Sequence, residues 1–324
     1  MLSAIPSPSS NAINIGAFHL RYYGMCIALG VFAAIWLADR RHVSRGGNPD
    51  DFGYIGVRAA LGGLVGARAY HVLTDWKSFE GRWGDVIKVW QGGLGIPGGL
   101  VLGAFVGLWA AHKRGLTGAY AFDVVAPAVP LAQAIGRLGN WFNQELFGRP
   151  TKLPWAVRID AQFRPLGYEA FSTFQPTFLY EALWNLALCG VLLGLDRRKV
   201  VPRGKLFAVY VVGYGVGRLW VETLRIDKAS KILGVRVNIW VSLLAIVGGL
   251  AYLFFGKSPA GDDDTPTVID REGDDTGEAE PPTNGTSDDT DGVEDTGAIE
   301  DTDAIEDTEL VEDTELVEPS TDAG

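Results

Sequence analysis

Seven apolar segments of about twenty residues each limit the folds open to this chain. They lie at 18–38, 53–73, 93–111, 119–138, 176–195, 206–224 and 239–256. A helix of about twenty apolar residues crosses the hydrocarbon core of a bilayer. Backbone polar groups in lipid must be satisfied internally, and these segments are too long for the strands of a barrel. We therefore predict an all-α, polytopic protein that is embedded in a membrane through about seven transmembrane helices.

The charge distribution divides the chain into two domains. Residues 1–257 contain 27 Lys and Arg against 14 Asp and Glu, whereas residues 258–324 contain 1 basic and 25 acidic residues. The acidic part ends in a near-repeat, GAIEDT, DAIEDT, ELVEDT. Its sparse apolar pairs cannot offset the entropy cost of ordering. We predict a membrane domain over 1–257 and a disordered, acidic, low-complexity tail over 258–324.

Loop charges indicate the orientation, because Lys and Arg concentrate on the cytoplasmic side. With the N-terminus outside, the inner loops 39–52, 112–118 and 196–205 hold basic residues at twice the density of the outer loops 74–91, 140–175 and 225–238. This predicts a cytoplasmic tail and an outer head segment at 140–175. Neither Cys26 nor Cys189 has the spacing of a disulfide or zinc site, and we predict no metal and no cofactor.

Placing an ionisable residue at membrane depth costs free energy, so such residues are interpreted first as functional. Several converge at the outer ends of the helices, in the stretches IGRLGNWFNQELFGRP (135–150), TFQPTFLYEAL (173–183) and YGVGRLWVETLR (214–225). Arginines at one depth suit phosphate, through the bidentate geometry of the guanidinium. A phosphate at a membrane surface belongs to a phospholipid headgroup. The alternative is a structural ion-pair network that locks the helices together.

A glycine-rich segment, QGGLGIPGGL (91–100), opens the third apolar segment on the same side. Its backbone N–H groups at a helix start are typical of an anion cradle that includes Gly98 and Gly99. The alternative is that these small residues allow two helices to pack closely. Asp123, near the inner end of the fourth segment, is more readily explained as a helix cap or a partner of a loop arginine.

The stretch 135–150 resembles the signature of the prolipoprotein diacylglyceryl transferases, a family whose pattern reads roughly G-R-x-G-N-F-x-N-x-E-x-x-G-R. The matching positions are Gly136, Arg137, Gly139, Asn140, Asn143, Glu145, Gly148 and Arg149. Trp141 replaces the usual Phe and Gln144 the usual Gly. Further segments resemble the family in the expected order: RYYGM with Tyr23, QPTFLYE (175–181), and YGVGRLWVETLR with Tyr214, Arg218, Glu222 and Arg225. Pro97 stands where the family commonly has a histidine.

The resemblance implies transfer of the diacylglyceryl group from phosphatidylglycerol to the lipobox cysteine of a preprolipoprotein signal peptide, with release of glycerol 1-phosphate. It implies a bacterial plasma (inner) membrane protein whose active site faces outward. We expect Arg137 and Arg218 to hold the phosphate with the help of Asn140, and Tyr23 to take or relay the thiol proton. Substrate-binding roles are expected for Gly98, Gly99, Asn143, Glu145, Gly148, Arg149, Tyr214 and Glu222, with Glu145 and Glu222 orienting the arginines.

Three bases for the thiol remain open: a tyrosine, a phosphate oxygen, or electrostatic activation without a base. Two other functions also remain. A phospholipid-binding scaffold without catalysis would use the same arginines, and a small-solute transporter also places charges in the membrane. Against the transporter, the helices show no internal repeat. Nothing in the sequence indicates a nucleic-acid partner.

Overall fold

The computed structural model describes residues 4–15 and 18–258. The predicted acidic tail, from 259 onward, and its near-repeat lie outside the described residues. The chain divides after Glu272, and everything described below belongs to the first unit, Met1–Glu272.

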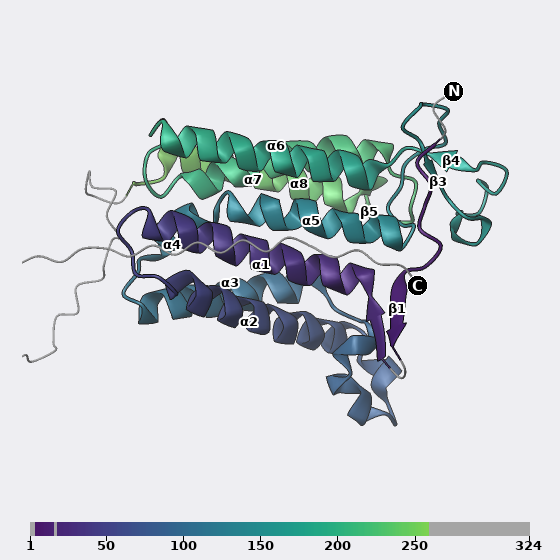
Figure 1. Ribbon diagram of the computed structural model, residues 1–324, viewed down its shortest axis with the longest axis horizontal. Helices are drawn as coiled ribbons and strands as arrows, with labels where there is room; N and C mark the ends of the chain where they lie inside the picture. Colours follow the sequence, from purple (N-terminus) through teal and green to yellow (C-terminus); the bar gives the residue numbers. More distant parts are fainter. Residues whose placement is uncertain (1–3, 16–17, 259–324) are drawn as a thin grey trace, which may run out of the picture. The chain divides into compact units, whose positions relative to one another are not determined.

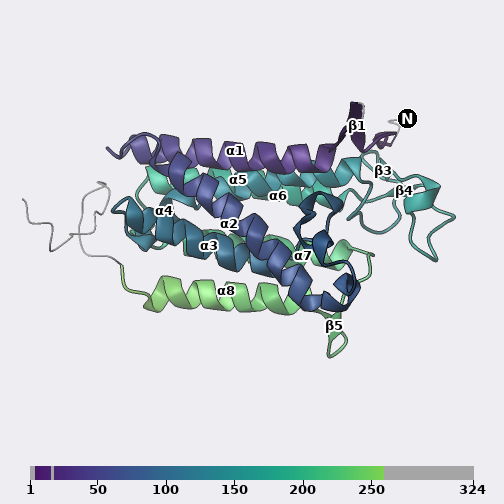
Figure 2. The ribbon, with the colours of Figure 1, turned by 90° about the horizontal axis from the view of Figure 1, so that it is seen from below.

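The described residues form a bundle of eight α-helices (Figures 1 and 2). They are α1 (Tyr22–Val43), α2 (Asp51–Thr74), α3 (Ile96–Lys113), α4 (Gly118–Val125), α5 (Ala128–Phe142), α6 (Thr177–Arg197), α7 (Leu206–Leu224) and α8 (Val237–Phe255). The most extensive contacts join α2 to α3, α1 to α5, α7 to α8 and α5 to α6. Helices from both halves of the sequence therefore meet around α5, because α1 and α6 pack against it.

The helices coincide with the apolar segments of the sequence, and three of them are candidate membrane spans by length and composition. These are α1, α6 and α8, and the bent pair of α4 and α5 makes a fourth candidate within the described residues. Helices α2, α3 and α7 are not among these candidates, and α2 and α7 carry glycines and arginines within their apolar stretches. The fold is thus mostly helical and the chain is a membrane protein, as predicted.

The fourth apolar segment, predicted as one helix over 119–138, is broken into α4 and α5, which are bent by 44°. Pro127 lies at the break, where it lacks the backbone N–H that a continuous helix would donate to the preceding turn. Arg41 from α1 donates to the freed carbonyl oxygens of Asp123, at 2.8 Å, and Val124. The Asp123 carboxylate accepts from the backbone N–H groups of Gly204 and Leu206. Asp123 is therefore a cap, as expected, but of α7 rather than of its own helix.

Three antiparallel strand pairs also occur in the described residues, which the all-α prediction missed. They are β1 (Ala12–Ile15) with β2 (Phe18–Arg21), β3 (Val157–Arg158) with β4 (Thr173–Phe174), and β5 (Lys231–Ile232) with β6 (Val235–Arg236). Short 3₁₀ helices lie at Trp76–Phe79, Trp83–Ile87, Val89–Gln91 and Ala161–Phe163. The strands gather at one end of the bundle, called here the sheet end (Figures 1 and 2). The opposite, turn end holds the connections 44–50, 114–117 and 198–205.

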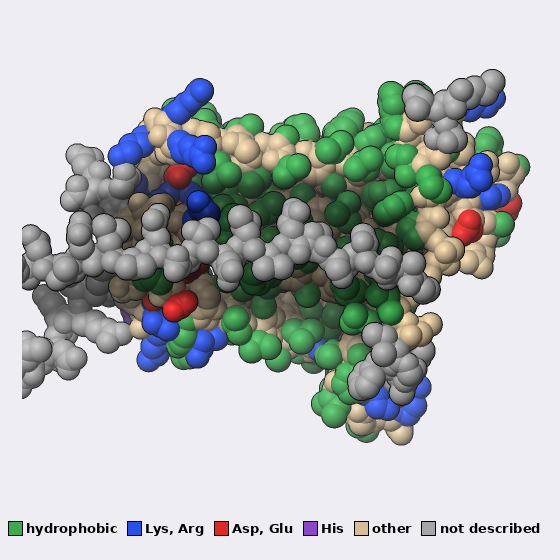
Figure 3. Space-filling view, viewed as in Figure 1, with side chains coloured by type: hydrophobic (Ala, Val, Ile, Leu, Met, Phe, Trp, Pro, Cys, Tyr) green, Lys and Arg blue, Asp and Glu red, His purple; other side chains and the backbone are tan. Residues whose placement is uncertain are grey.

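The surface of the bundle is apolar between its two ends. Figure 3 shows hydrophobic side chains along the middle of one face and Lys and Arg at both ends. Large side chains such as Phe32, Leu73 and Phe254 are 68–77% exposed. Contact with water is energetically unfavourable for such apolar side chains, whereas contact with the hydrocarbon of a bilayer is not. The exposed belt agrees with the membrane character of the sequence.

Candidate functional site

Four helices and one loop bring the predicted site residues together at the sheet end. Helix α5 ends there, α6 begins there, α7 ends there and α8 begins there. The loop 143–148 leaves α5 and is fixed to the end of α7 by an antiparallel bridge between Gly148 and Arg225. Residues that lie far apart in the sequence thus converge on one volume.

Arg137 and Arg218 share one carboxylate. Nη2 of Arg137 lies 2.5 Å from Oε1 of Glu181, and Nη1 of Arg218 lies 3.2 Å from Oε2 of the same residue. Glu181 is 3% exposed, and it lies one turn into α6. A buried carboxylate between two guanidinium groups holds both at a fixed spacing. The sequence analysis placed Glu181 at membrane depth but gave it no role, because nothing in the sequence shows which arginines it meets.

Glu222 extends this pair into a longer chain of charges. It is fully buried, and Arg218 Nη2 approaches its Oε2 at 2.9 Å in an ion pair whose geometry makes no hydrogen bond. Its Oε1 accepts from Arg236 Nε at 2.5 Å and from Asn238 Nδ2 at 3.2 Å. Glu222 therefore contacts Arg218, and its expected role in orienting that arginine stays a prediction. Arg236, just before α8, was missed, although an arginine that opens an apolar segment was a usable signal.

Asp227 closes the chain beyond the end of α7. It pairs with Arg225 at 2.7 Å and with Arg236 at 3.2 Å. Burial alone would raise the pKa of Asp227, but the hydrogen bond from Arg225 and the charges of both arginines hold it below its usual value. We call the resulting series the ion-pair chain. Its members, in order of contact, are Arg137, Glu181, Arg218, Glu222, Arg236, Asp227 and Arg225.

Amide side chains form a branch from Arg137. Its Nη1 donates to Oδ1 of Asn140 at 3.4 Å, and Nδ2 of Asn140 donates to Oε1 of Glu145 at 2.8 Å. Asn143 donates to the same Oε1 at 3.0 Å. Glu145 was expected to orient the arginines. In the structure its described hydrogen-bond partners are the two amides, and it reaches Arg137 only through Asn140.

The loop that carries Glu145 has an unusual backbone. Gln144 and Leu146, on either side of it, have positive φ angles of 50° and 57°. Residues other than glycine rarely adopt such backbone angles. The buried Gln144 amide donates to the Pro8 carbonyl at 3.2 Å and to Asp160 at 2.7 Å, and it accepts from the Asp160 backbone N–H. These hydrogen bonds offset the strain at a position where the resembled pattern has glycine.

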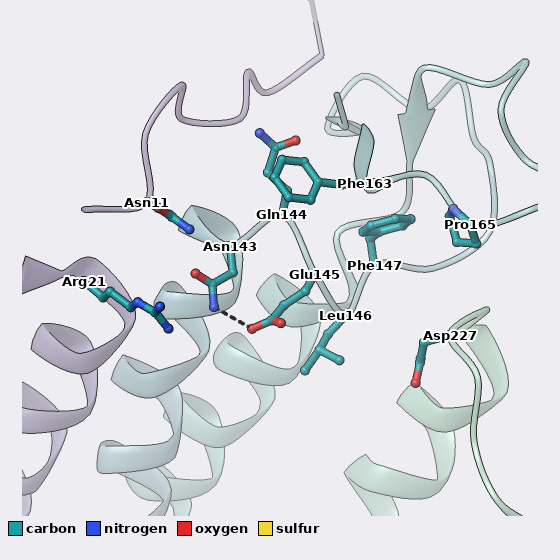
Figure 4. Close-up of a pocket in the computed structure, with 10 residues that line it drawn as sticks. All are labelled: Asn11, Arg21, Asn143, Gln144, Glu145, Leu146, Phe147, Phe163, Pro165 and Asp227. Carbon is teal, nitrogen blue, oxygen red and sulfur yellow. Dashed lines mark hydrogen bonds between the residues drawn. The ribbon is translucent and has the colours of Figure 1, made fainter. Parts of the chain in front are cut away.

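A pocket of about 490 Å³ lies beside this loop. Figure 4 shows its lining, with the Glu145 carboxylate between the N-terminal segment and the end of α7. Polar groups and aromatic rings both line the pocket. The lining residues are Asn11, Arg21, Asn143, Gln144, Glu145, Leu146, Phe147, Phe163, Pro165 and Asp227.

Tyr23 lies at the start of α1, directly against α5. A Cβ added to Gly139 would lie 2.7 Å from a ring carbon of Tyr23 and 3.1 Å from its Cα. Only glycine therefore lets α1 approach this closely, which explains Gly139 physically. The Tyr23 phenol interacts electrostatically with both Glu145 and Arg137. The structure thus joins Tyr23 to the predicted site.

The remaining predicted residues lie around this cluster. A Cβ on Gly148 would lie within 3 Å of Thr177 and of the Leu224 carbonyl oxygen, so Gly148 allows a close backbone contact. Arg149 is exposed and donates to the Thr223 carbonyl at 3.2 Å. Tyr214, one turn before Arg218, stacks on Tyr210 at 6.0 Å. Their roles in substrate binding stay predictions.

Gly98 and Gly99 lie in the first turn of α3, against α2. Cβ atoms there would meet the carbonyl oxygens of Gly66, at 2.2 Å, and Gly63, at 3.1 Å. This is the close helix packing that the sequence analysis gave as the alternative, and an anion-binding role for these glycines stays a prediction. Arg68 of α2 donates to backbone carbonyls of Asp85, Val86, Gly92 and Gly93, and so it organises the preceding loop.

His42 and His71 lie away from the ion-pair chain. His42 is fully buried at the turn end, between the Tyr120 hydroxyl at 2.9 Å and Asp51 at 3.1 Å. His71, in the last turn of α2, packs edge-on against Phe79. Among the residues that the structure describes, no group of three or more His, Cys, Asp or Glu could hold a metal ion.

Comparison with known proteins identifies the family of this chain. Residues 10–255 match the family described as prolipoprotein diacylglyceryl transferase. The chain is 50% identical to the phosphatidylglycerol–prolipoprotein diacylglyceryl transferase of Frankia casuarinae over 263 residues, 80% of this chain and 64% of that protein. It is 48% identical to the enzyme of that name from Frankia alni, over 82% of this chain and 71% of the relative. Transferase 2 of Streptomyces coelicolor is also 48% identical, over 78% and 80%.

The chain spans slightly less than two thirds of the Frankia casuarinae relative and more than two thirds of the other two. The match covers all eight helices and every predicted site residue. This chain therefore belongs to the prolipoprotein diacylglyceryl transferase family.

Proposed function

We propose that this chain transfers the diacylglyceryl group of phosphatidylglycerol to the lipobox cysteine of a preprolipoprotein. The sulfur forms a thioether with the glyceryl carbon, and glycerol 1-phosphate leaves. The observation that carries the proposal is the pair of arginines, Arg137 and Arg218, held on one buried carboxylate in a membrane bundle of this family. The names of the relatives, which include phosphatidylglycerol and prolipoprotein, support both the donor and the acceptor.

The arginines suit the charge changes of this reaction. The donor phosphodiester carries one negative charge, and the departing phosphate monoester carries nearly two. Donors aimed at charge that develops in the transition state are usually the largest catalytic contribution. Arg137 and Arg218 are 21% and 13% exposed, so their charges act in a largely dehydrated site. Asn140 would add a hydrogen bond to the same phosphate.

The other predicted residues support this site in distinct ways. Glu181 and Glu222 fix the positions of the guanidinium groups, and Tyr23 reaches the same volume from α1. Asn143, Gly148, Arg149 and Tyr214 would shape the surroundings of the headgroup and the peptide. Gly98 and Gly99 would contribute through the packing of α3 on α2.

We further propose seven spans in the bacterial inner membrane, with α4 and α5 together forming the fourth. The N-terminus and the sheet end lie outside, and the turn end and the acidic tail lie in the cytoplasm. The density of Lys and Arg in the loops of the turn end supports this orientation. The segment 140–175, which pairs with the N-terminal residues through Ile5 and Val157, would be the outer head that meets the signal peptide.

The test is a direct assay of the purified protein in detergent. Phosphatidylglycerol and a lipobox peptide are supplied, and the thioether product is detected by mass. We expect product with the wild type and none with a Cys→Ala peptide. Arg137→Gln should lower turnover by about 10²–10³-fold, the usual effect of removing one transition-state donor.

Arg82→Gln provides the matched control, because Arg82 is an exposed arginine whose only described ion pair is a 4.0 Å contact with Asp85. It should retain wild-type turnover. Binding of phosphatidylglycerol without any product would identify a lipid-binding scaffold instead. Movement of a solute across vesicles, again without product, would identify a transporter.

A further inference from the structure

The carboxylate of Glu145 differs from those of the ion-pair chain. Glu181, Glu222 and Asp227 each lie within 4 Å of at least one arginine, and the first two are buried. Glu145 has no such ion pair, and its described partners are the neutral amides of Asn140 and Asn143. Within the described residues, Glu145 therefore adjoins the ion-pair chain without forming an ion pair with a guanidinium group.

The geometry of Glu145 leaves one of its oxygens open. Both amides donate to Oε1, and no described group donates to Oε2. The residue is half-buried and lines the 490 Å³ pocket with the rings of Phe147 and Phe163 (Figure 4). The two amide hydrogen bonds hold Oε1, so Oε2 remains available to a group bound in the pocket that Glu145 lines. A carboxylate held in this way can accept a proton from a bound group.

We propose that Glu145 is the general base that takes the proton of the substrate cysteine. The inference rests on the proposed function. The thiol proton passes to Oε2 of Glu145, and the sulfur electron pair attacks the glyceryl carbon. The bond between that carbon and the phosphate oxygen breaks, and its electron pair leaves with glycerol 1-phosphate. The proton then passes from Glu145 to the departing phosphate monoester or to water, which restores the carboxylate.

The ion-paired carboxylates are poor candidates for this role. An adjacent opposite charge favours the ionised form of a carboxylate and so weakens it as a proton acceptor. Four charged or titratable groups face Glu145 from the surrounding elements: Arg21 from β2, Tyr23 from α1, Arg137 through Asn140, and Asp227 beyond α7. Arg137 is close enough to favour a thiolate beside the base, yet it does not contact the base itself.

The alternatives fit less well. A tyrosine with an ordinary pKa near 10 is almost wholly protonated at neutral pH and accepts no proton. His71 lies at the end of α2, in contact with Phe79 and beside Gly93, a different part of the sheet end. Pro97 occupies the position where the resembled family commonly has a histidine. Glu145 thus fills a role that the sequence left open.

The test compares Glu145→Gln with the wild type from pH 7 to pH 9.5, using the cysteine peptide. Glutamine keeps an oxygen that can accept from Asn140 and Asn143, so the loop should be preserved. We expect a loss of about 10²–10⁴-fold at pH 7. The loss should shrink by about 30-fold by pH 9.5, because a free thiol with a pKa of about 8.5 is then ionised by the solvent.

A selenocysteine peptide provides a second readout at pH 7. Its selenol is ionised without a base, so Glu145→Gln should form the selenoether at close to the wild-type rate. Arg137→Gln should be rescued neither by pH nor by selenium, because it acts on the leaving phosphate. His71→Asn should behave as the wild type throughout, and equal unfolding temperatures would show that the variants are folded.

The outcomes separate the role of Glu145 as the base from the proposed function on which it rests. Full activity of Glu145→Gln at pH 7 would overturn the role of Glu145, as would a loss that is the same at every pH and with both peptides. A selenium-rescued loss in His71→Asn would transfer the role to that histidine. No thioether from the wild type would overturn the proposed function itself, and the base with it.

Discussion

Glu181→Gln is the substitution that tests the ion-pair chain most directly. It removes the charge that Arg137 and Arg218 share, at 2.5 Å and 3.2 Å, while it keeps the size of the side chain. Removing one partner of a buried ion pair costs about 3–5 kcal/mol, because the remaining charge is left uncompensated. Here two guanidinium groups lose a partner at once.

Two features of the structure reduce that cost. The arginine side chains are 21% and 13% exposed, so water recovers part of their solvation, and Arg218 keeps Glu222 as a partner at 2.9 Å. We therefore expect a loss of about 2–4 kcal/mol in the free energy of unfolding. A domain of this size loses about 2–4 °C in unfolding temperature per kcal/mol. The expected decrease is thus about 4–16 °C by the same scaling.

Thermal unfolding in detergent measures this directly. Glu80→Gln is the matched control, because Glu80 is an exposed acid without a described ion pair. Surface changes of this kind stay within about 0.5 kcal/mol. If Glu181→Gln unfolded at the temperature of Glu80→Gln, the shared carboxylate would contribute nothing to stability and the reasoning would be refuted.

Three further predictions follow from other contacts. Gly139→Ala places a Cβ 3.1 Å from the Cα of Tyr23, so α1 must move, at a cost of about 1–3 kcal/mol; thermal unfolding against Gly84→Ala, where no atom lies within 4 Å, checks this. Asp51→Asn removes the charge of a buried carboxylate that contacts the buried His42 and the exposed Arg114 at the turn end, and it should cost about 2–3 kcal/mol while turnover per folded molecule at 20 °C is unchanged. Asp227 has a pKa below its usual value when folded, so its contribution to stability is present above about pH 4 and is lost as the pH falls through the folded pKa. Asp227→Asn should therefore unfold at a lower temperature than the wild type at pH 7, and the two should converge as the pH falls below 4.

Much of the bundle could be predicted from the sequence, because apolar length is a property of each segment alone. Six of the seven predicted segments coincide with single helices. The break in the fourth was missed, since hydropathy does not register the lost N–H of Pro127 or the capping of the freed carbonyls by Arg41. Residues 18–21 were also assigned to the first helix, because hydropathy does not register strand pairing. In the structure they pair with 12–15 as strands.

The site was predicted in its members but not in its contacts. The spacing of Arg218 and Glu222 on one helix already indicates their pairing, and the structure has it at 2.9 Å. The sharing of Glu181 by arginines of α5 and α7 depends on how three helices pack, which no local pattern determines. Helix packing also decides what can be said of Gly98. The sequence allowed an anion cradle or close helix packing, and the structure shows the close packing of α3 on α2.

The ion-pair chain has a consequence for how an anion enters this bundle. It contains four arginines and three carboxylates, so at neutral pH it holds a surplus of one positive charge. A phosphodiester carries one negative charge. In the empty protein, Glu181 acts as a resident counter-ion between Arg137 and Arg218. On the proposed function, an arriving headgroup would exchange one oxyanion partner for another, and its single negative charge would balance the surplus positive charge of the ion-pair chain.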